Sequence, residues 1–277
     1  MKPLRHLAFV LEDFALQTPA QQLLDRFLFG YRRNDAFHKL DGVRVSVARA
    51  SDLQSPSTAP DPLRARATEA GLQLTDLPAA VRDAEAVIII PRADSASPAV
   101  PNLAAALTNA QRGAPCFVFG ALAPDLATAR TFTTLAAARQ ITLAAGTTLP
   151  VTWRLPQVDL PANAPVDEAL IVVQGPSPLA ELHALDGLLP VLERRLGGER
   201  GVRQVKFLSG RDLWRAGDRR EWSWGLLAAA LSRSDSPQGD ALVDGRTQDL
   251  VGLGLVPKLA TDPRGWLLED RKSTRLN

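Results

Sequence analysis

The sequence has little cysteine, because Cys116 is the only one among 277 residues. A disulfide within one chain is therefore excluded, and the place of Cys116 in the apolar run PCFVFG predicts a buried, unreactive thiol. No apolar run approaches the ~20 residues of a membrane-spanning helix; the longest lies around Ala86–Ile90. The apolar part of the N-terminal stretch MKPLRHLAFVLED is too short for a secretory signal, so we expect a cytoplasmic protein.

Charge of one sign is not concentrated anywhere in the chain. The formal net charge is +2, and the arginines are scattered among acids. Nucleic-acid binding needs a clustered basic footprint, so we expect neither a nucleic-acid partner nor a membrane. The 45% apolar and 22% charged fractions are those of an ordinary soluble globular protein, for which a small-molecule substrate remains the expectation.

What is present in the first half is a regular alternation of strands and helices. Val43–Ala50 alternates with period two, and Ala86–Pro91 (AVIIIP) is continuously apolar, which is typical of a central parallel strand. Further strands are expected at Leu4–Leu11, Leu72–Leu74, Cys116–Gly120 and Ile141–Ala145, with helices from Thr18-Pro19 and over Leu63–Ala70, Leu77–Ala84, Val100–Gln111 and Asp125–Arg139. This alternation predicts an α/β, Rossmann-like, doubly wound parallel sheet.

The composition changes after the stretch Ile141–Pro156, which we interpret as the seam between two domains. Beyond it we predict strands at Glu168–Gln174 and Val202–Leu208, and helices at Leu179–Leu196 and Trp222–Ser232. The pattern indicates an α+β domain with an incomplete sheet. We therefore expect a Rossmann-like domain over residues 1–150 and a substrate or oligomerisation domain over 151–269.

The last eight residues, DRKSTRLN at 270–277, read as the translation of a common sequencing adapter. We expect the native reading frame to be lost at about Glu269, with a non-native tail after it, and we leave this tail out of the fold.

The first βα turn indicates whether a Rossmann-like domain can bind a dinucleotide in the usual way, because a glycine-rich loop at this turn lets the backbone approach a pyrophosphate. The turn reads LEDFALQTPAQQ, without glycine, and its carboxylates Glu12 and Asp13 would repel phosphates. The candidate cofactor contacts are Glu12, Asp52 and Pro91. Asp52, just past the second strand, suits the ribose-binding role or is a solvated loop acid.

The helix after the seam carries a candidate acid–base group. His183 and Asp186 are three residues apart in ELHALDG and share a helix face. His183 suits general acid–base catalysis with Asp186 completing the polar site, or it makes one structural hydrogen bond. A single histidine among scattered acids lacks metal-ligand spacing, so we expect no metal.

Candidate substrate contacts lie at the seam and in a later polar loop. Trp153 and Arg154 offer an indole for stacking and a guanidinium for an anion; the alternative is a core tryptophan beside a surface arginine. Asp244 and Arg246, with Asp249, belong to the polar stretch ALSRSDSPQGDALVDGRTQDL, which is either functional or merely solvated.

These motifs resemble the Gfo/Idh/MocA oxidoreductases. The resemblance rests on the βαβ half, the seam, and the following α+β half, whose helix carries the HALD motif. More narrowly, the segments LPVTWRLP, HALD, ERRLGGERGV, DLWRAGD, ALSRSDSPQG and DGRTQDL, roughly from Thr148 to Arg264, resemble a group of bacterial proteins placed near that family. It implies hydride transfer with NAD or NADP on a sugar or polyol, His183 as the catalytic histidine with Asp186 beside it in the motif, and a second-domain sheet that mediates homo-oligomers.

The sequence departs from that family at three places. Leu179 stands where an acid usually precedes the histidine, Ala121-Leu122-Ala123 replaces Glu-Lys-Pro, and the glycine loop is missing. The alternatives are therefore a non-catalytic pseudo-oxidoreductase that binds a small molecule or protein partner, and a structural subunit.

Overall fold

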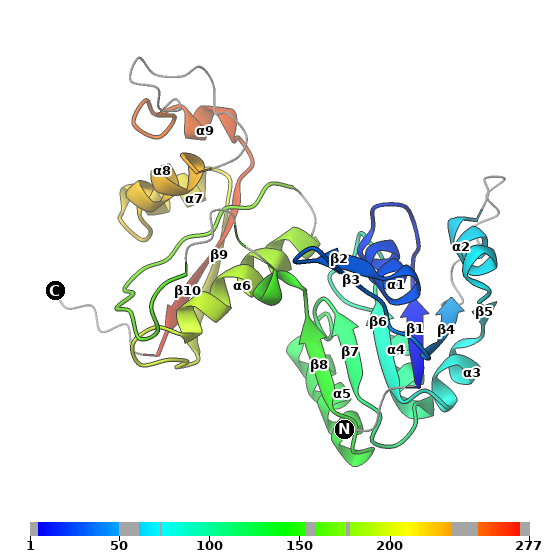
Figure 1. Cartoon of the computed structure of the whole chain (residues 1–277). Coiled ribbons are helices and arrows are strands. Elements are labelled where there is room, and N and C mark those ends of the chain that lie inside the picture. The colour runs from blue at the N-terminus through cyan, green and yellow to red at the C-terminus, as the bar shows by residue number, and fades with distance from the viewer. Residues whose placement is uncertain are drawn as a thin grey trace. The chain divides into compact units, whose positions relative to one another are not determined.

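The computed structural model describes residues 5–49, 61–72, 74–152, 154, 159–175, 178–233 and 249–271 (Figure 1). The chain divides into two compact units. The first comprises Met1–Thr148 and Gly175–His183, and the second comprises Leu149–Gln174 and Ala184–Asn277.

The first unit is built on a six-stranded parallel sheet with the order β5-β4-β1-β6-β7-β8 (Figure 1). The strands are β1 (His6–Leu11), β4 (Arg44–Arg49), β5 (Leu74–Thr75), β6 (Ala86–Ile90), β7 (Cys116–Phe119) and β8 (Leu143–Gly146). Numbered among themselves, they follow the 3-2-1-4-5-6 order of the doubly wound dinucleotide-binding fold. The predicted Rossmann-like class is confirmed, and the strand order reverses between β1 and β6.

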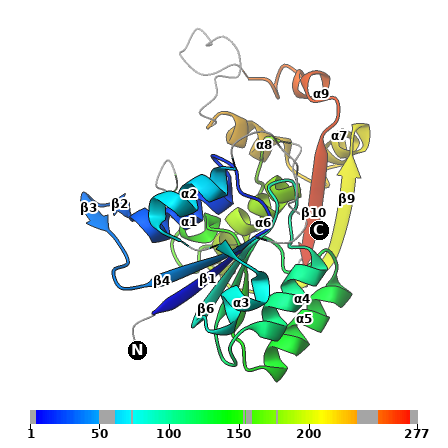
Figure 2. The same cartoon turned by 90° about the vertical axis from the view of Figure 1, so that its right-hand side faces the viewer.

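Helices cover both faces of this sheet, which explains its nearly continuous apolar strands. The helices are α1 (Pro19–Phe29), α2 (Pro62–Ala70), α3 (Leu77–Arg82), α4 (Val100–Asn109) and α5 (Leu126–Ala138). Figure 2 shows α3, α4 and α5 on one face and α1 and α2 on the other. A hydrophobic core lies between the sheet and the helices on each face, and alternate residues of β1 contribute to the two cores. Val10 packs under α3 and α4, and Phe9 packs under α1 and α2. Each such fully buried side chain contributes about 1.5–3 kcal/mol.

A β-hairpin that sequence analysis did not predict lies between α1 and β4. Its strands are β2 (Tyr31–Arg33) and β3 (Ala36–His38), which pair only with each other among the described residues. Asn34 and Asp35 both adopt positive φ (49° and 62°), as a two-residue type I′ turn requires. Two short strands of charged and aromatic residues carry little apolar periodicity, which is why the sequence pattern does not reveal them.

The second unit contains a two-stranded antiparallel sheet and short helices. Its elements are η1 (Leu149–Val151), the later turns of α6 (Pro178–Glu193), β9 (Val202–Ser209), α7 (Arg211–Asp218), α8 (Trp224–Leu231), α9 (Val256–Leu259) and β10 (Arg264–Asp270). The sheet consists of β9 and β10. A small core forms around Leu227, Leu250 and Val256, with three tryptophans packed against it.

One predicted strand is wrong. Residues 168–174 form no strand, although EALIVVQ has high β propensity. The neighbouring side chains Leu170 and Ile171 are used instead in packing: Leu170 joins the core around Leu227, and Cδ1 of Ile171 lies 3.3 Å from where a Cβ of Gly187 would be. A strand needs a ladder partner, and β9 pairs with β10. Helix α7 and strand β10 were not predicted.

Candidate functional site

Two of the predicted cofactor contacts lie side by side at the carboxyl edge of the parallel sheet. Glu12 follows β1 and Pro91 follows β6, and the backbone N of Glu12 donates to the carbonyl of Ile90 at 3.1 Å. Both residues are buried. This is the point where the strand order reverses, which is where ligands bind in open α/β sheets.

Glu12 is fixed by the first turn of α4. Its Oε1 accepts hydrogen bonds from the backbone N of Ala99 and from Nδ2 of Asn102, both at 2.7 Å. The residue is only 4% exposed. Ala99, at the N-cap position, has no side chain able to cap α4, so Glu12 supplies the missing acceptor from another strand. A carboxylate here also interacts favourably with the positive end of the helix dipole.

The helices that follow the other strands are closed in the same way. Thr18 caps α1, Asp61 caps α2, Asp76 caps α3 and Asp125 caps α5, each by accepting a backbone N–H with its side chain. Pro19 at the start of α1 removes a further donor. At each of these five helix N-termini, one or two backbone amides that could bind a pyrophosphate therefore already have a side-chain acceptor. Four of the five capping side chains are carboxylates.

The loop after β6 adds a charged pair to this edge. Arg92 binds both carboxylate oxygens of Asp94, through Nε at 2.9 Å and Nη2 at 3.0 Å. This hydrogen bonding raises the pKa of Arg92, and the charges of Asp13 and Glu12 act in the same direction. The same pairing lowers the pKa of Asp94. The only guanidinium in this loop is thus already neutralised by the protein.

Arg49 is a candidate that sequence analysis missed. It is the last residue of β4, the second strand in the order of the fold, where an arginine accommodates a 2′-phosphate in NADP-binding proteins. Here it makes a two-point ion pair with Asp61 (Nη1–Oδ2 2.7 Å, Nη2–Oδ1 2.9 Å). The signal that could have found it is its position at the end of VRVSVAR. Asp52, predicted for this neighbourhood, lies outside the described residues.

The predicted catalytic histidine also lies at the carboxyl edge of the first unit. The ring of His183 meets that of Phe119 edge to face, with centroids 6.4 Å apart and an interplanar angle of 86°. Phe119 ends β7, so its backbone is two strand spacings, roughly 10 Å, from that of Glu12. Leu179 and Leu182 anchor this part of α6 in the core beneath α1 and α2. Asp186 lies one turn further along α6.

Of the predicted substrate contacts, Arg154 is the one that lies within the described residues, and it belongs to the second unit. Arg154 forms an ion pair with Asp159 at 2.9 Å, and both side chains are exposed. Trp153, Asp244 and Arg246 lie outside the described residues, so these three assignments stay predictions.

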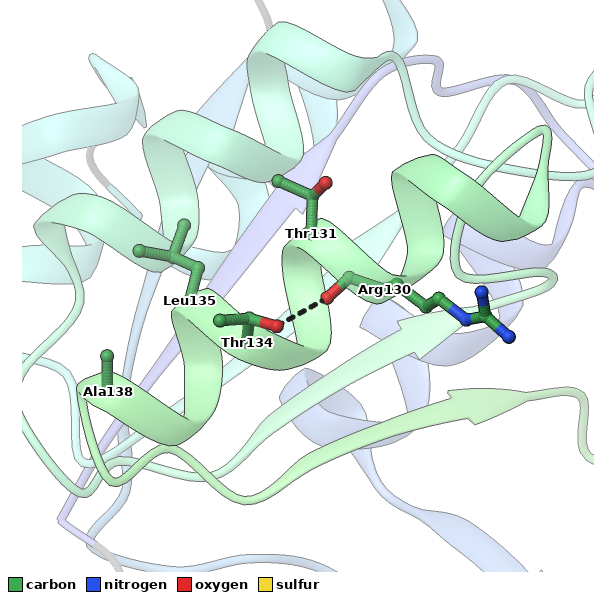
Figure 3. Close-up of a pocket in the computed structure, with 5 residues that line it drawn as sticks. All are labelled: Arg130, Thr131, Thr134, Leu135 and Ala138. Carbon is green, nitrogen blue, oxygen red and sulfur yellow. Dashed lines mark hydrogen bonds between the residues drawn. The ribbon is translucent and has the colours of Figure 1, made fainter.

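A shallow depression on the outside of α5 offers little chemistry. Figure 3 shows its lining by Arg130, Thr131, Thr134, Leu135 and Ala138, which share one side of the helix. The hydroxyl of Thr134 donates to the carbonyl of Arg130 at 2.8 Å. Arg130 is the one titratable side chain among these five residues, which makes this surface a poor candidate for a reaction site.

Within the described ranges, no group of three or more histidine, cysteine, aspartate or glutamate side chains is placed to hold a metal ion. Likewise, none of the helices there is long and apolar enough to cross a membrane.

No protein-family model matches the chain, and a search of curated proteins finds no match. Among solved structures, the chain is similar to biliverdin reductase from Synechocystis sp. PCC 6803, crystallised with biliverdin and NADP+. The sequence identity is 15% and the TM-score 0.44, over 74% of this chain. The chain spans 61% of the length of that protein.

Proposed function

We propose that this chain is a relative of the Gfo/Idh/MocA oxidoreductases that binds a small molecule or protein partner without transferring hydride. The kinship rests on the strand order and on the HALD motif of α6. The observation that carries the proposal is the closed carboxyl edge, where side chains of the protein cap α1 to α5.

The first βα turn does not fit a dinucleotide held in the usual way. A pyrophosphate brings negative charge to a helix N-terminus, and free amides there stabilise it. Here the side chain of Thr18 has taken one amide, Pro19 removes another, and the buried Glu12 carboxylate stands at the strand end. Repulsion between like charges in a buried site opposes phosphate binding.

Hydride transfer with NAD or NADP on a sugar- or polyol-like substrate is the second candidate. It is favoured by the place of His183 beside Phe119, at the edge where a Rossmann fold presents its ligand. In this role His183 would exchange a proton with the substrate hydroxyl or carbonyl. The family that the chain resembles has the lysine of its Glu-Lys-Pro motif at this place. Here the motif is replaced by Ala121-Leu122-Ala123, so hydride transfer would lack that cation.

The test is a titration of the full chain with NADH and NADPH, in which binding is measured by calorimetry and by nicotinamide fluorescence. We expect no saturation up to about 1 mM, the upper end of ordinary Michaelis constants. The matched variant Glu12→Gln keeps an oxygen acceptor for α4 and removes the charge, so a gain of binding in this variant alone would identify the charge as the barrier. Saturable micromolar binding by the unaltered chain, with turnover abolished by His183→Ala, would establish the second candidate instead.

We also propose that the second unit mediates a homo-oligomer. The support is an exposed apolar face of the β9–β10 sheet: Phe207 and Trp266 are paired in register with ring centroids 4.7 Å apart, and Val205 and Leu268 form the next pair. Contiguous exposed apolar surface marks interaction sites. Sedimentation velocity should show an assembly that Phe207→Ser weakens, whereas a monomer at all concentrations would refute this assignment.

A further inference from the structure

The connection between α1 and β4, residues 30–43, carries the β2–β3 hairpin and is here named the hairpin arm. Helix–strand connections in α/β units usually take about two to six residues, and longer ones are commonly functional. In Figure 2 the hairpin projects from the body of the first unit. The arm is therefore an addition that the sheet itself does not need.

Local contacts within the arm favour the hairpin conformation. Gly30 turns the chain with φ +84°, and a Cβ at this position would lie 2.4 Å from the carbonyl oxygen of His38. Asn34 and Asp35 close the hairpin in the left-handed region. At its base, Tyr31 and His38 stack with centroids 5.5 Å apart. A preordered arm loses little conformational entropy when a partner binds.

The exposed chemistry of the arm is aromatic and cationic. Every residue of β2 and β3 is exposed, and Phe37 reaches 60%. Arg32 faces Phe37 across the hairpin. Neither Arg32, Arg33 nor Lys39 forms an ion pair in the part of the chain that the structure describes. By contrast, the arginines with the ion pairs Arg49–Asp61, Arg66–Asp25 and Arg92–Asp94 in the same unit are neutralised.

We propose that the hairpin arm docks an extended acidic segment of a partner protein, which adds to the hairpin as a third strand. A sheet of two strands leaves outer N–H and C=O groups able to pair with another chain. Tyrosine, phenylalanine and arginine are enriched in protein interfaces. Acidic side chains on the added segment would neutralise Arg32, Arg33 and Lys39. The arm also carries Asp35 and Asp41, so its positive charge is only partly uncompensated. This suits a peptide that mixes apolar and acidic residues better than the dense, uniform charge of a nucleic acid.

This site is separate from the carboxyl edge discussed above. The arm ends where β4 begins, so it lies at the amino edge of the sheet. The proposal therefore goes beyond the proposed function, and a nicotinamide titration leaves it untouched.

The test measures binding of fluorescein-labelled ten-residue peptides to the full chain by fluorescence anisotropy. The probe alternates Glu and Val, and the matched probes alternate Lys and Val or carry N-methyl groups on the central residues of the Glu/Val peptide. We expect saturable binding of the Glu/Val peptide, weakened about tenfold by N-methylation because strand pairing is lost, and weakened by salt. The Lys/Val peptide should not bind.

Variants assign the binding to the arm. The double variant Arg32→Glu/Arg33→Glu should weaken the Glu/Val peptide by about tenfold or more, since charge reversal opposes an acidic segment. Phe37→Ser should weaken it without a change of charge, and Arg130→Glu on α5 should leave it unchanged. Circular dichroism checks that each variant is folded.

Absence of saturable binding, equal binding of the acidic and basic peptides, or indifference to all three arm substitutions would overturn the proposal. Phosphatidylserine vesicles and a single-stranded oligothymidine test the other classes of partner. Tighter binding of either one, lost in the Arg32→Glu/Arg33→Glu variant, would also overturn it.

Discussion

Oε1 of Glu12 lies 2.7 Å from the backbone N of Ala99, so a carboxylate just after β1 caps a helix whose N-cap residue lies 87 residues later in the chain. The contact connects the two sides of the topological switch point, because Glu12 directly follows β1 and α4 follows β6. It also converts a helix N-terminus that an anionic ligand could use into part of the fixed structure.

The first prediction concerns this cap. Glu12→Ala removes the acceptor of two hydrogen bonds in a buried place and should lower the free energy of unfolding by about 2 kcal/mol. Glu12→Gln keeps the oxygen and loses only the interaction of the charge with the helix, so it should cost about 0.5–1 kcal/mol. Urea unfolding followed by circular dichroism measures both. Equal losses for the two variants would contradict the capping role.

Asp61 gives a pH-dependent prediction. Burial would raise the pKa of Asp61, but the hydrogen bond from Arg49 and those from the amides of Arg64 and Leu63 outweigh it, so the net shift is downward. A lowered folded pKa means that the stability from the charge is present above the unfolded value, about 3.9, and is lost as the pH falls through the folded value.

Asp61→Asn keeps an N-cap acceptor and removes the charge. It should therefore cost about 1 kcal/mol at pH 7, and the difference from the unaltered protein should shrink below about pH 4. Urea unfolding at a series of pH values measures the difference, with Asp61→Ala as a control that loses the cap at every pH. A cost for Asp61→Asn that stays constant into acid would rule out the charge as its origin.

Cys116 should be inert in the native protein. Burial raises the pKa of its thiol from 9.0 to about 12. A thiol-specific disulfide reagent at pH 8 should label the native chain only as fast as it unfolds, and the denatured chain at once. Fast labelling under native conditions would show that β7 opens locally.

The same burial predicts an alkaline loss of stability. Because the folded pKa is raised, the contribution of Cys116 is complete below pH 9.0 and is lost as the pH rises toward about 12. The slope is at most about 1.4 kcal/mol per pH unit. Cys116→Ala should lack this component, so the stability difference between the two proteins should narrow or reverse between these pH values.

Gly217 and Gly225 of the second unit allow a comparison between a crowded helix position and an open one. A Cβ on Gly217 in α7 would lie 2.6 Å from Cζ2 of Trp222 and 2.8 Å from Nε1 of Trp224. Gly217→Ala should therefore cost about 1–3 kcal/mol through overpacking and shift the tryptophan emission. On Gly225 in α8, the nearest atom to a Cβ is Oγ of Ser223 at 3.5 Å, so Gly225→Ala should be neutral or gain up to about 1 kcal/mol from helix propensity. Equal effects would contradict the tight packing around Gly217.

Most strands and helices of the first unit could be predicted from the sequence, because its buried strands are continuous runs of apolar residues. Ala86–Pro91 and Cys116–Gly120 were placed to within a residue or two of β6 and β7. Helices α1 and α5 of this unit begin at caps that the sequence shows, Thr18-Pro19 and Asp125. Local pattern and tertiary packing agree there, so the pattern was sufficient.

The second unit was harder to predict for a physical reason. EALIVVQ has the composition of a strand, yet residues 168–174 lack a pairing partner, whereas Arg264–Asp270 with alternating exposure pairs along β9. Strand formation depends on a partner far away in the sequence, which composition does not contain. In the candidate site, Glu12 and Pro91 could be placed from the sequence because each directly follows a predicted strand, and their role as cofactor contacts stays a prediction. The capping of α4 by Glu12 joins residues 87 apart and has no local signature.

The place of β1 in the middle of its sheet has a consequence during protein synthesis. Phe9 of β1 pairs with Val47 of β4 on one side and with Ile88 of β6 on the other. The first strand to be synthesised can therefore pair on both edges only after two later strands have been synthesised. Residues 175–183 then return to the same unit, where Leu179 is buried. A ribosome must therefore synthesise nearly two thirds of the chain before the core beneath α1 and α2 is complete, and until then apolar side chains of β1 such as Phe9 remain available to chaperones.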